Sequence, residues 1–357
     1  MEDKRQPHFV RYLLAGRCLA EKVTIEPALR QQVLDGLRSY LRPPAASDTQ
    51  TVDDLLYHVG GEKNLDWLIG NFPEQLTEAE KARLVASTNI SSAKYILVQN
   101  ALLRIMQEAS DPMTRHTAGC VLSGIGDPRD LDELVEVPAG VFLMGSDKTK
   151  DELAYGDEEP QHTRTLPAYR IGKYPVTNGQ YAAFVAATGH AAPSHWRGNQ
   201  PPPELRNHPV VNVTWHDAVD YCVWLSQAVG REMRLPTEAE WERAARHTDG
   251  RIYPWDNDFD AGRCNMADTG IGGTSPVGIF PAGDAVCGAA DMAGNVWEWT
   301  SSLWGKDWQK PEFGYPYDAT DGRENLNAPD AVLRTLRGGS FRSIARLVRC
   351  AYRRVQS

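Results

Sequence analysis

Thiol and imidazole side chains are the first candidates for chemistry in this sequence, and their spacing excludes several kinds of site. No two cysteines form a C-x-x-C pair; they are Cys18, Cys120, Cys222, Cys264, Cys287 and Cys350. This scatter predicts neither a zinc site nor a small disulfide scaffold, and we expect reduced thiols. The early histidines, His8, His58 and His116, match no metal-ligand spacing.

A second group of candidates lies near the C-terminus. Phe341, Arg342 and Ile344 bring aromatic, cationic and aliphatic side chains into one short segment. Such a mixture is typical of the anchor residues of a binding surface. The alternative is a strand in which Phe341 and Ile344 belong to the core while Arg342 and Ser343 face water.

Composition narrows the class of protein. The chain has 357 residues, with 38 basic and 47 acidic side chains and a net charge of −9. This balance argues against a general nucleic-acid binder, which neutralises phosphates with Lys and Arg. The N-terminus leads into no apolar signal region, and no apolar run approaches the ~18 residues of a membrane span. We therefore expect a cytoplasmic protein without a membrane span.

The chain is expected to contain two domains, in keeping with about 150 residues per domain. Residues 1–130 show apolar residues at helical spacing, including a helix over Ile96–Met106, and predict a small all-α domain whose role is unknown. Residues 131–357 contain nine of the ten tryptophans and mix short strands with long loops, which indicates an α+β domain. Three of its helices are expected to begin at the capping residues Thr177, Thr214 and Thr237.

Two further expectations concern this second part. Residues 136–145 predict a β-hairpin that turns at Pro138–Gly140. Trp297 and Trp299 are expected in the core, and Trp304 and Trp308 at the surface.

Six motifs of the second part stand in a recognisable order. They are Val137–Ser146 (VPAGVFLMGS), Tyr174–Tyr181 (YPVTNGQY), Pro209–Trp215 (PVVNVTW), Arg234–Glu242 (RLPTEAEWE), Gly294–Thr300 (GNVWEWT) and Arg337–Ser340 (RGGS). Together they resemble the formylglycine-generating-enzyme-like (sulfatase-modifying-factor) domains. The resemblance implies a C-type-lectin-like fold of the formylglycine-generating-enzyme type, with long loops. It does not cover residues 1–130.

The resemblance also bears on catalysis. Formylglycine-generating enzymes oxidise a substrate cysteine with two cysteines of their own, which hold copper as thiolates. The positions of that pair are occupied here by Ser343 and Val348. A hydroxyl is a poor ligand for Cu(I) and valine is none, so we expect no copper and no catalytic residue. The iron-dependent sulfoxide synthases are also excluded, because residues 1–130 lack their histidine-rich motif.

The resemblance further implies structural calcium. In the enzyme family, oxygen atoms from two loops hold Ca²⁺, which suits a hard cation. The first site falls here on Asp291, Gly294, Val296 and Glu298. The second falls on Asn265 and Met266 with a carboxylate near Asp268, although the loop length differs there.

The segment Arg337–Arg353 is similar to the C-terminal variable region of proteins diversified by diversity-generating retroelements. In those proteins a fixed frame surrounds positions rewritten by adenine-specific mutagenesis, commonly from AAC template codons to NNC codons. The residues that interrupt the frame here are all NNC-encodable: Phe341, Arg342, Ser343, Ile344 and Leu347. Gln356 is not. The family's domain normally runs on to a closing strand, so the variable region is expected to be incomplete here.

These observations predict a non-catalytic ligand-binding protein of prokaryotic or phage origin. Its contacts would be Phe341, Arg342, Ser343, Ile344, Leu347 and Arg354. The partner would be a protein or another macromolecule, and the helical domain would itself bind protein. Two alternatives remain open. One is an oxidoreductase or sulfatase activator with a displaced thiol, Cys350, and the other is an adaptor that acts through residues 1–130.

Overall fold

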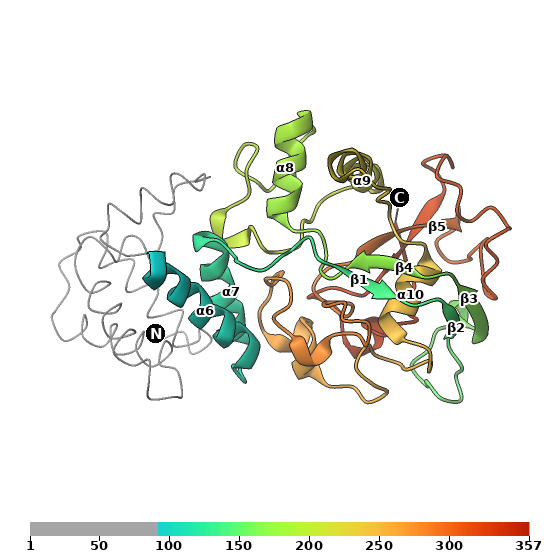
Figure 1. Cartoon of the computed structure of the whole chain (residues 1–357). Coiled ribbons are helices and arrows are strands. Elements are labelled where there is room, and N and C mark those ends of the chain that lie inside the picture. Colours follow the sequence, from blue (N-terminus) through green and yellow to red (C-terminus); the bar gives the residue numbers. More distant parts are fainter. Residues whose placement is uncertain (1–91, 357) are drawn as a thin grey trace, which may run out of the picture. The chain divides into compact units, whose positions relative to one another are not determined.

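The structure is a computed structural model that describes residues 92–356, and it divides into two compact units (Figure 1). The first unit consists of Met1–Arg129 together with Gln200–Asn207. The second consists of Asp130–Asn199 and His208–Ser357. The helices expected before residue 92 lie outside the described residues.

Two helices form the described part of the first unit, α6 (Ser92–Glu108) and α7 (Pro112–Ile125). The predicted helix over Ile96–Met106 is confirmed. Asp111 caps α7, because its carboxylate accepts a hydrogen bond from the Thr114 amide. A later segment joins this unit at η2 (Pro203–Leu205), where the Ser123 hydroxyl donates to the Pro203 carbonyl over 2.9 Å.

Three capped helices belong to the second unit: α8 (Asn178–Thr188), α9 (Trp215–Val229) and α10 (Glu238–Arg246). Each follows the threonine predicted to cap it, and each has a complete capping box. α8 and α9 end at Gly189 and Gly230, both in the left-handed conformation that glycine adopts without strain. None of the described helices is long and apolar enough to cross a membrane.

Three small antiparallel sheets complete the second unit. β1 (Leu134–Val137) pairs with β4 (Tyr169–Gly172), and β2 (Gly140–Met144) pairs with β3 (His162–Leu166). The third sheet has the order β5 (Glu298–Gly305), β6 (Leu333–Arg337), β7 (Arg354–Gln356). Together with the capped helices, these sheets define the mixed α+β fold that the sequence predicts.

The predicted hairpin over residues 136–145 is wrong. Its two arms lie in different sheets, and each pairs with a strand that comes later in the chain. Val137 and Phe142 accordingly point into separate core clusters. Tertiary partners thus override a local turn signal, as is common for strands.

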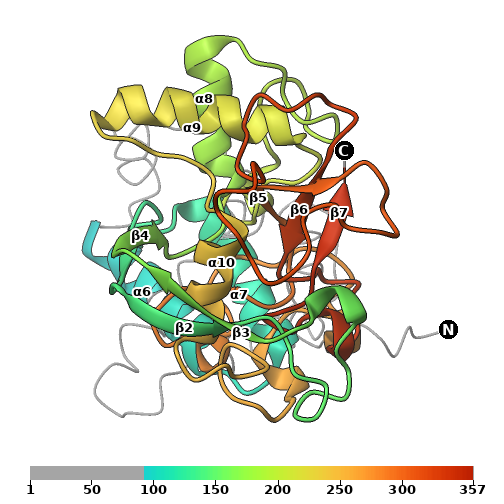
Figure 2. The ribbon, with the colours of Figure 1, turned by 90° about the vertical axis from the view of Figure 1, so that its right-hand side faces the viewer.

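Helix α10 connects these sheets. It packs against β2 and against β5 and β6, as Figure 2 shows. Trp241, near the middle of α10, is fully buried with Val137, Met292 and Cys350. The helix is short, but every one of its residues is buried, so its polar side chains must find partners inside the protein.

Between α10 and β5 the described chain has no helix longer than a single 3₁₀ turn and no strand. These long loops are held by close packing. A Cβ added to Gly283 would lie 1.8 Å from the carbonyl oxygen of Arg263. Gly283 is therefore required by the close approach of two loops.

We expect Gly283→Ala to destabilise the second unit by about 3 kcal/mol or more, because the backbone of a neighbouring loop would have to move. Gly273→Ala is the matched control, since a Cβ there meets nothing within 4 Å and the change should cost less than about 1 kcal/mol. Chemical denaturation followed by tryptophan fluorescence measures both. Equal losses for the two variants would contradict the packing argument.

Candidate functional site

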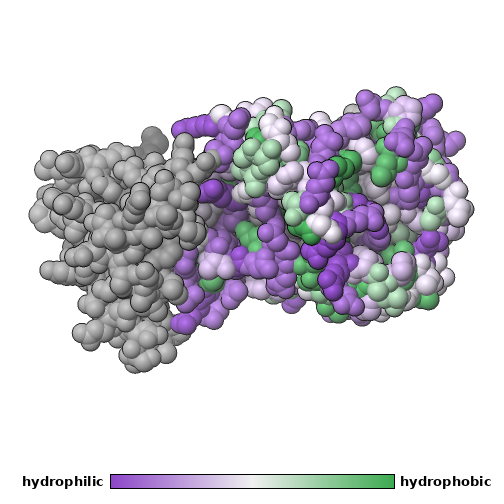
Figure 3. Space-filling view, turned by 45° about the horizontal axis from the view of Figure 1, so that its top comes forward, coloured by the Kyte–Doolittle hydropathy of each residue, from purple (hydrophilic) through white to green (hydrophobic). Residues whose placement is uncertain are grey.

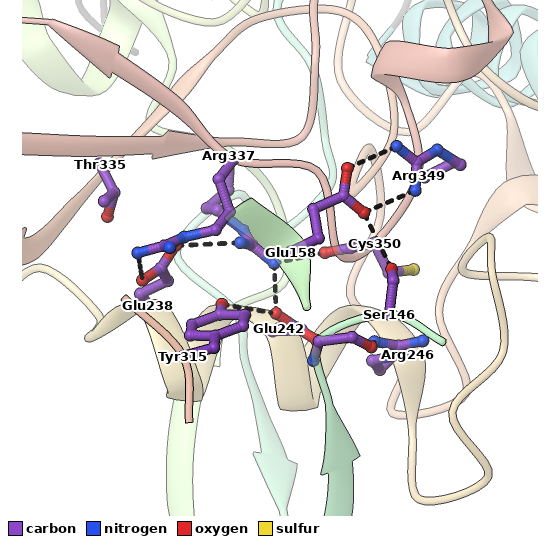
Figure 4. A network of polar contacts seen from close by, with 12 residues as sticks. Ser146, Glu158, Glu238, Glu242, Arg246, Tyr315, Thr335, Arg337, Arg349 and Cys350 are labelled. Atoms are coloured by element: carbon purple, nitrogen blue, oxygen red, sulfur yellow. Dashed lines mark hydrogen bonds and ion pairs between the residues drawn. The ribbon is translucent and has the colours of Figure 1, made fainter. Parts of the chain in front are cut away.

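The C-terminal segment is anchored by arginines that lie inside the protein. Arg337 is fully buried and its guanidinium bonds to Glu238 (3.0 Å) and Glu242 (2.6 Å), both on α10. Arg353 bonds to the same Glu238, at 2.7 and 2.9 Å. Figure 4 shows Glu238, Glu242 and Arg337 within this network.

A second buried cluster fixes the turn between β6 and β7. Arg349 is fully buried and bonds to Glu158 with both terminal nitrogens (2.6 and 2.7 Å) and to Asp151 (2.6 Å). The Ser146 hydroxyl donates to Glu158 over 2.8 Å. Both acids come from the loop after β2, so this ion cluster binds that loop to the C-terminal segment.

In the two clusters, the buried positive charges of the arginines are paired with buried negative charges of carboxylates. Burial alone would raise the pKa of Glu242, but Arg337 and Arg246 hold that pKa below its ordinary value. Arg337, Arg349, Arg353 and Arg246 face four carboxylates, those of Glu238, Glu242, Glu158 and Asp151. Charges buried in this way are retained only when paired and hydrogen-bonded.

Five of the six predicted contact residues reach the surface. Ile344 is 57% exposed, Arg342 and Arg354 are exposed, and Phe341 and Leu347 are half-buried. The alternative of a strand with Phe341 and Ile344 in its core does not hold, because this stretch is a turn that leads into η6 (Ala345–Leu347).

Ser343 is the exception. It is 3% exposed, and its hydroxyl accepts a hydrogen bond from the Ser340 amide over 2.9 Å. Its amide and carbonyl are also bonded, to the Ser340 carbonyl and to the Ala267 amide. The expectation that Ser343 contributes a surface contact is therefore corrected: its side chain closes the turn.

Four residues next to this surface were not singled out as contacts by the sequence analysis. Arg346 stacks on the ring of Tyr155, with 3.6 Å from the guanidinium carbon to the ring centroid. Tyr155 lies 5.5 Å from Tyr352, and Tyr352 lies 5.8 Å from Trp297, between ring centroids. Trp297 was expected in the core but is only partly buried. Tyr155 precedes Tyr352 by almost two hundred residues, and no sequence pattern connects them.

The other tryptophans depart from expectation in part. Trp308 is 67% exposed, as predicted, whereas Trp304 is 3% exposed and the prediction of a surface position for it is wrong. Its indole N–H donates to the Asp307 carbonyl, and its ring packs under the guanidinium of Arg353. The Trp304 ring is thus buried in contact with the guanidinium of Arg353.

The thiols of the described residues do not form a reactive pair. None of the five cysteines among the described residues is in a disulfide: Cys120, Cys222, Cys264, Cys287 and Cys350. Cys350 is fully buried, and burial raises the pKa of its thiol to about 12. Val348, at one position of the enzymes' cysteine pair, is also fully buried. A nucleophilic or metal-binding thiol needs the opposite, a lowered pKa and access.

Carboxylates gather at the first predicted metal site. Glu298 accepts a hydrogen bond from the Trp241 indole at one oxygen, and its other oxygen is buried without a hydrogen-bond partner. Asp291 has a left-handed backbone and accepts a hydrogen bond from the Gly278 amide over 2.7 Å. Burial, and secondarily the charge of Asp291, raise the pKa of Glu298 to about 7. Asp284 was not predicted from the sequence. Burial, and secondarily the charge of Asp291, raise the pKa of Asp284 to about 7, and one of its side-chain oxygens is buried without a hydrogen-bond partner among the described residues.

These residues suit a hard cation, which would satisfy the buried oxygens and stabilise the ionised carboxylates. The acids Asp284, Asp291 and Glu298 do not all come within 4.8 Å of one another. A bound ion would therefore be coordinated by one or two of these carboxylates together with backbone carbonyls. Gly294 and Val296 are the residues predicted to supply those carbonyls.

The second predicted metal site fits less well. The Met266 carbonyl already accepts hydrogen bonds from the amide and the hydroxyl of Thr269, and the Asn265 side-chain oxygen accepts from the same hydroxyl. Asp268 is exposed. An ion there would have to displace Thr269.

Comparison with known proteins agrees with this architecture. The family described as "Sulfatase-modifying factor enzyme 1-like domain" matches residues 125–357, more than half of the chain. The chain is 34% identical over 263 residues to the formylglycine-generating enzyme of Thermomonospora curvata, covering 58% of this chain and 82% of that protein. Among solved structures, PvdO from Pseudomonas aeruginosa is 28% identical with a TM-score of 0.50, covering 63% of this chain and 88% of that one.

The structure of Treponema denticola variable protein 1 is also similar, at 24% identity and a TM-score of 0.47, with 63% of this chain and 89% of that one covered. The match of the family model and of the enzyme from Thermomonospora curvata shows that the mixed α+β unit is of the formylglycine-generating-enzyme type. The chain belongs to the sulfatase-modifying-factor family.

The carboxyl cluster predicts a pH dependence in calcium-free buffer. The pKa of Glu298 rises from 4.5 to about 7 on folding, so the folded state holds a proton that the unfolded state has lost between these values. The free energy of unfolding should therefore fall as pH rises from 4.5 to 7, by up to about 3 kcal/mol, and level off above.

The variant Glu298→Gln should make this decline less steep, because its side chain has no proton to lose, while Asp284, whose pKa is also raised to about 7, still contributes. Denaturation curves at several pH values measure the effect. An equally steep decline in the variant would assign the pH dependence to other groups.

Proposed function

We propose that this protein is a non-catalytic binding protein whose C-terminal surface is diversified by a retroelement. One observation carries the proposal: the segment from Arg337 to Arg354 separates into two sets of side chains. One set is buried and bonded to acids, as in Arg337, Arg349 and Arg353, and the other is exposed. A scaffold held by the first set can exchange the second at little cost.

Four of the five interruptions of the fixed frame belong to the side chains that reach the surface, a set that also includes Arg346, Tyr352 and Arg354. Phe341, Arg342, Ile344 and Leu347 all reach the surface at least in part and are all NNC-encodable. Only Ser343 among the interruptions is buried. Exposed large side chains that mix aromatic, cationic and aliphatic groups are those that anchor protein partners.

An enzyme is the second candidate, because the curated relative described above is a formylglycine-generating enzyme. The resemblance places Ser343 and Val348 at the positions of the enzymes' two cysteines, and Cys350 is buried with a pKa of about 12. Copper-dependent oxygen consumption that is lost in Cys350→Ala would favour the enzyme. If the unaltered protein shows no copper-dependent oxygen consumption, the result favours the binding function.

Calcium enters the proposal as a structural ion at Asp291 and Glu298. The loops between α10 and β5 lack regular hydrogen bonding, so an ion that joins their ends to β5 would stabilise them.

We propose a cytoplasmic protein whose helical N-terminal part binds protein. Most of that part lies outside the described residues.

DNA sequencing of the gene and its surroundings in several close isolates tests the diversification. We expect a nearby near-repeat of the segment, a reverse-transcriptase gene beside it, and substitutions confined to codons such as those of Phe341, Arg342, Ile344 and Leu347. The codons of Arg337, Arg349 and Arg353 should not vary. A segment that is invariant and stands alone would refute diversification.

Paired substitutions test the division between frame and surface. Arg342→Ser removes an exposed side chain and should change the free energy of unfolding by less than about 0.5 kcal/mol. Arg349→Ser, the same change seven residues later, leaves Asp151 and Glu158 buried without their cation and should cost about 3–5 kcal/mol. Thermal and chemical denaturation provide the measurement, and comparable losses would contradict the proposal.

A further inference from the structure

The six arginines between Arg337 and Arg354 differ in their partners. Three are buried and bound to carboxylates. The other three, Arg342, Arg346 and Arg354, form no ion pair with any acid among the described residues, and each lies over an aromatic ring instead. The distances from guanidinium carbon to ring centroid are 5.3 Å to Phe341, 3.6 Å to Tyr155 and 5.2 Å to Trp297, respectively.

The rings under Arg346 and Arg354 form one continuous row, Tyr155–Tyr352–Trp297, with 5.5 and 5.8 Å between neighbouring centroids. Arg342 belongs to the same compact loop as Arg346: a Cβ built on Gly339 would lie 2.9 Å from the Leu347 carbonyl and 3.4 Å from the Ser343 hydroxyl. We call the three arginines and their four rings the arginine–aromatic surface. On the face drawn in Figure 3, hydrophilic residues predominate among the described residues, and hydrophobic residues form separate patches.

Stacking fixes the plane of a guanidinium and leaves its N–H edge for a ligand. The Nε of Arg346 donates to the Leu153 carbonyl over 2.8 Å, and its two terminal nitrogens have no partner among the described residues. The nearby acids Asp151 and Glu158 are occupied by Arg349. The three arginines of this surface thus have no ion-pair partner among the described residues, on a chain whose net charge is −9.

We propose that the arginine–aromatic surface binds an acidic segment of a protein partner through its carboxylates. Oriented guanidinium edges suit bidentate bonds to carboxylates, and the aromatic row supplies the apolar contact area that a protein interface needs. This inference rests on the proposed binding function and adds the chemistry of the partner. Arg346 and Tyr155 lie outside the interruptions of the frame, so they would serve every variant, whereas Arg342 lies at an interruption and would be specific to this one.

Poly-L-glutamate is the probe, titrated into the full chain by calorimetry at about 50 mM salt, where exposed charges interact over a Debye length above 10 Å. The variant R342Q/R346Q/R354Q should bind it at least about tenfold more weakly. The control R170Q/R197Q/R231Q has the same change in net charge at exposed arginines elsewhere and should stay within about twofold. Absence of binding to the unaltered chain, or equal losses in both variants, overturns the proposal.

Two further comparisons sharpen the test. R342K/R346K/R354K keeps the charge but loses the planar fork, and binding as tight as that of the unaltered chain would overturn the role of oriented guanidinium groups. Tighter binding of heparin than of poly-L-glutamate would assign the surface to sulfated glycans and overturn the protein partner. The gene-sequencing test and the poly-L-glutamate test can fail separately. If the gene varies as expected but poly-L-glutamate does not bind, the proposed binding function stands and only the acidic partner is refuted.

Discussion

The pairing of buried arginines with buried carboxylates is the constraint on which the second unit depends. Arg337 and Arg353 converge on α10, and Arg349 reaches the loop after β2. These contacts join parts of the chain separated by 95 to 198 positions. Replacing such a network by apolar residues can be neutral for stability, but removing one partner is costly, so the network specifies one arrangement more than it adds stability.

The loops and the surface follow from this arrangement. With β6 and β7 fixed on either side, short-range bonds of Ser340 and Ser343 hold the first part of the turn between them, where Arg342 and Ile344 are exposed. Tyr155 reaches the same surface because Glu158, three residues later, is bound to Arg349. A buried ion pair thereby positions a half-buried ring.

Sequence reasoning succeeded where the signal is local. Capping threonines located the starts of α8, α9 and α10, because those bonds are formed within a few residues. It failed where partners are distant: the hairpin over residues 136–145, the burial of Trp304, and the contribution of Tyr155 all depend on long-range packing. Ser343 was misplaced because an NNC-encodable residue can still be needed inside a turn.

The spacing of the buried arginines has a consequence for how this surface can evolve. Arg337, Arg349 and Arg353 each bind carboxylates that are held by other parts of the fold, so the positions of those acids restrict the number of residues between the arginines. An insertion or deletion between Arg349 and Arg353 would move one guanidinium away from its carboxylates. Under the proposed function, side chains would therefore be exchanged at constant length in this segment.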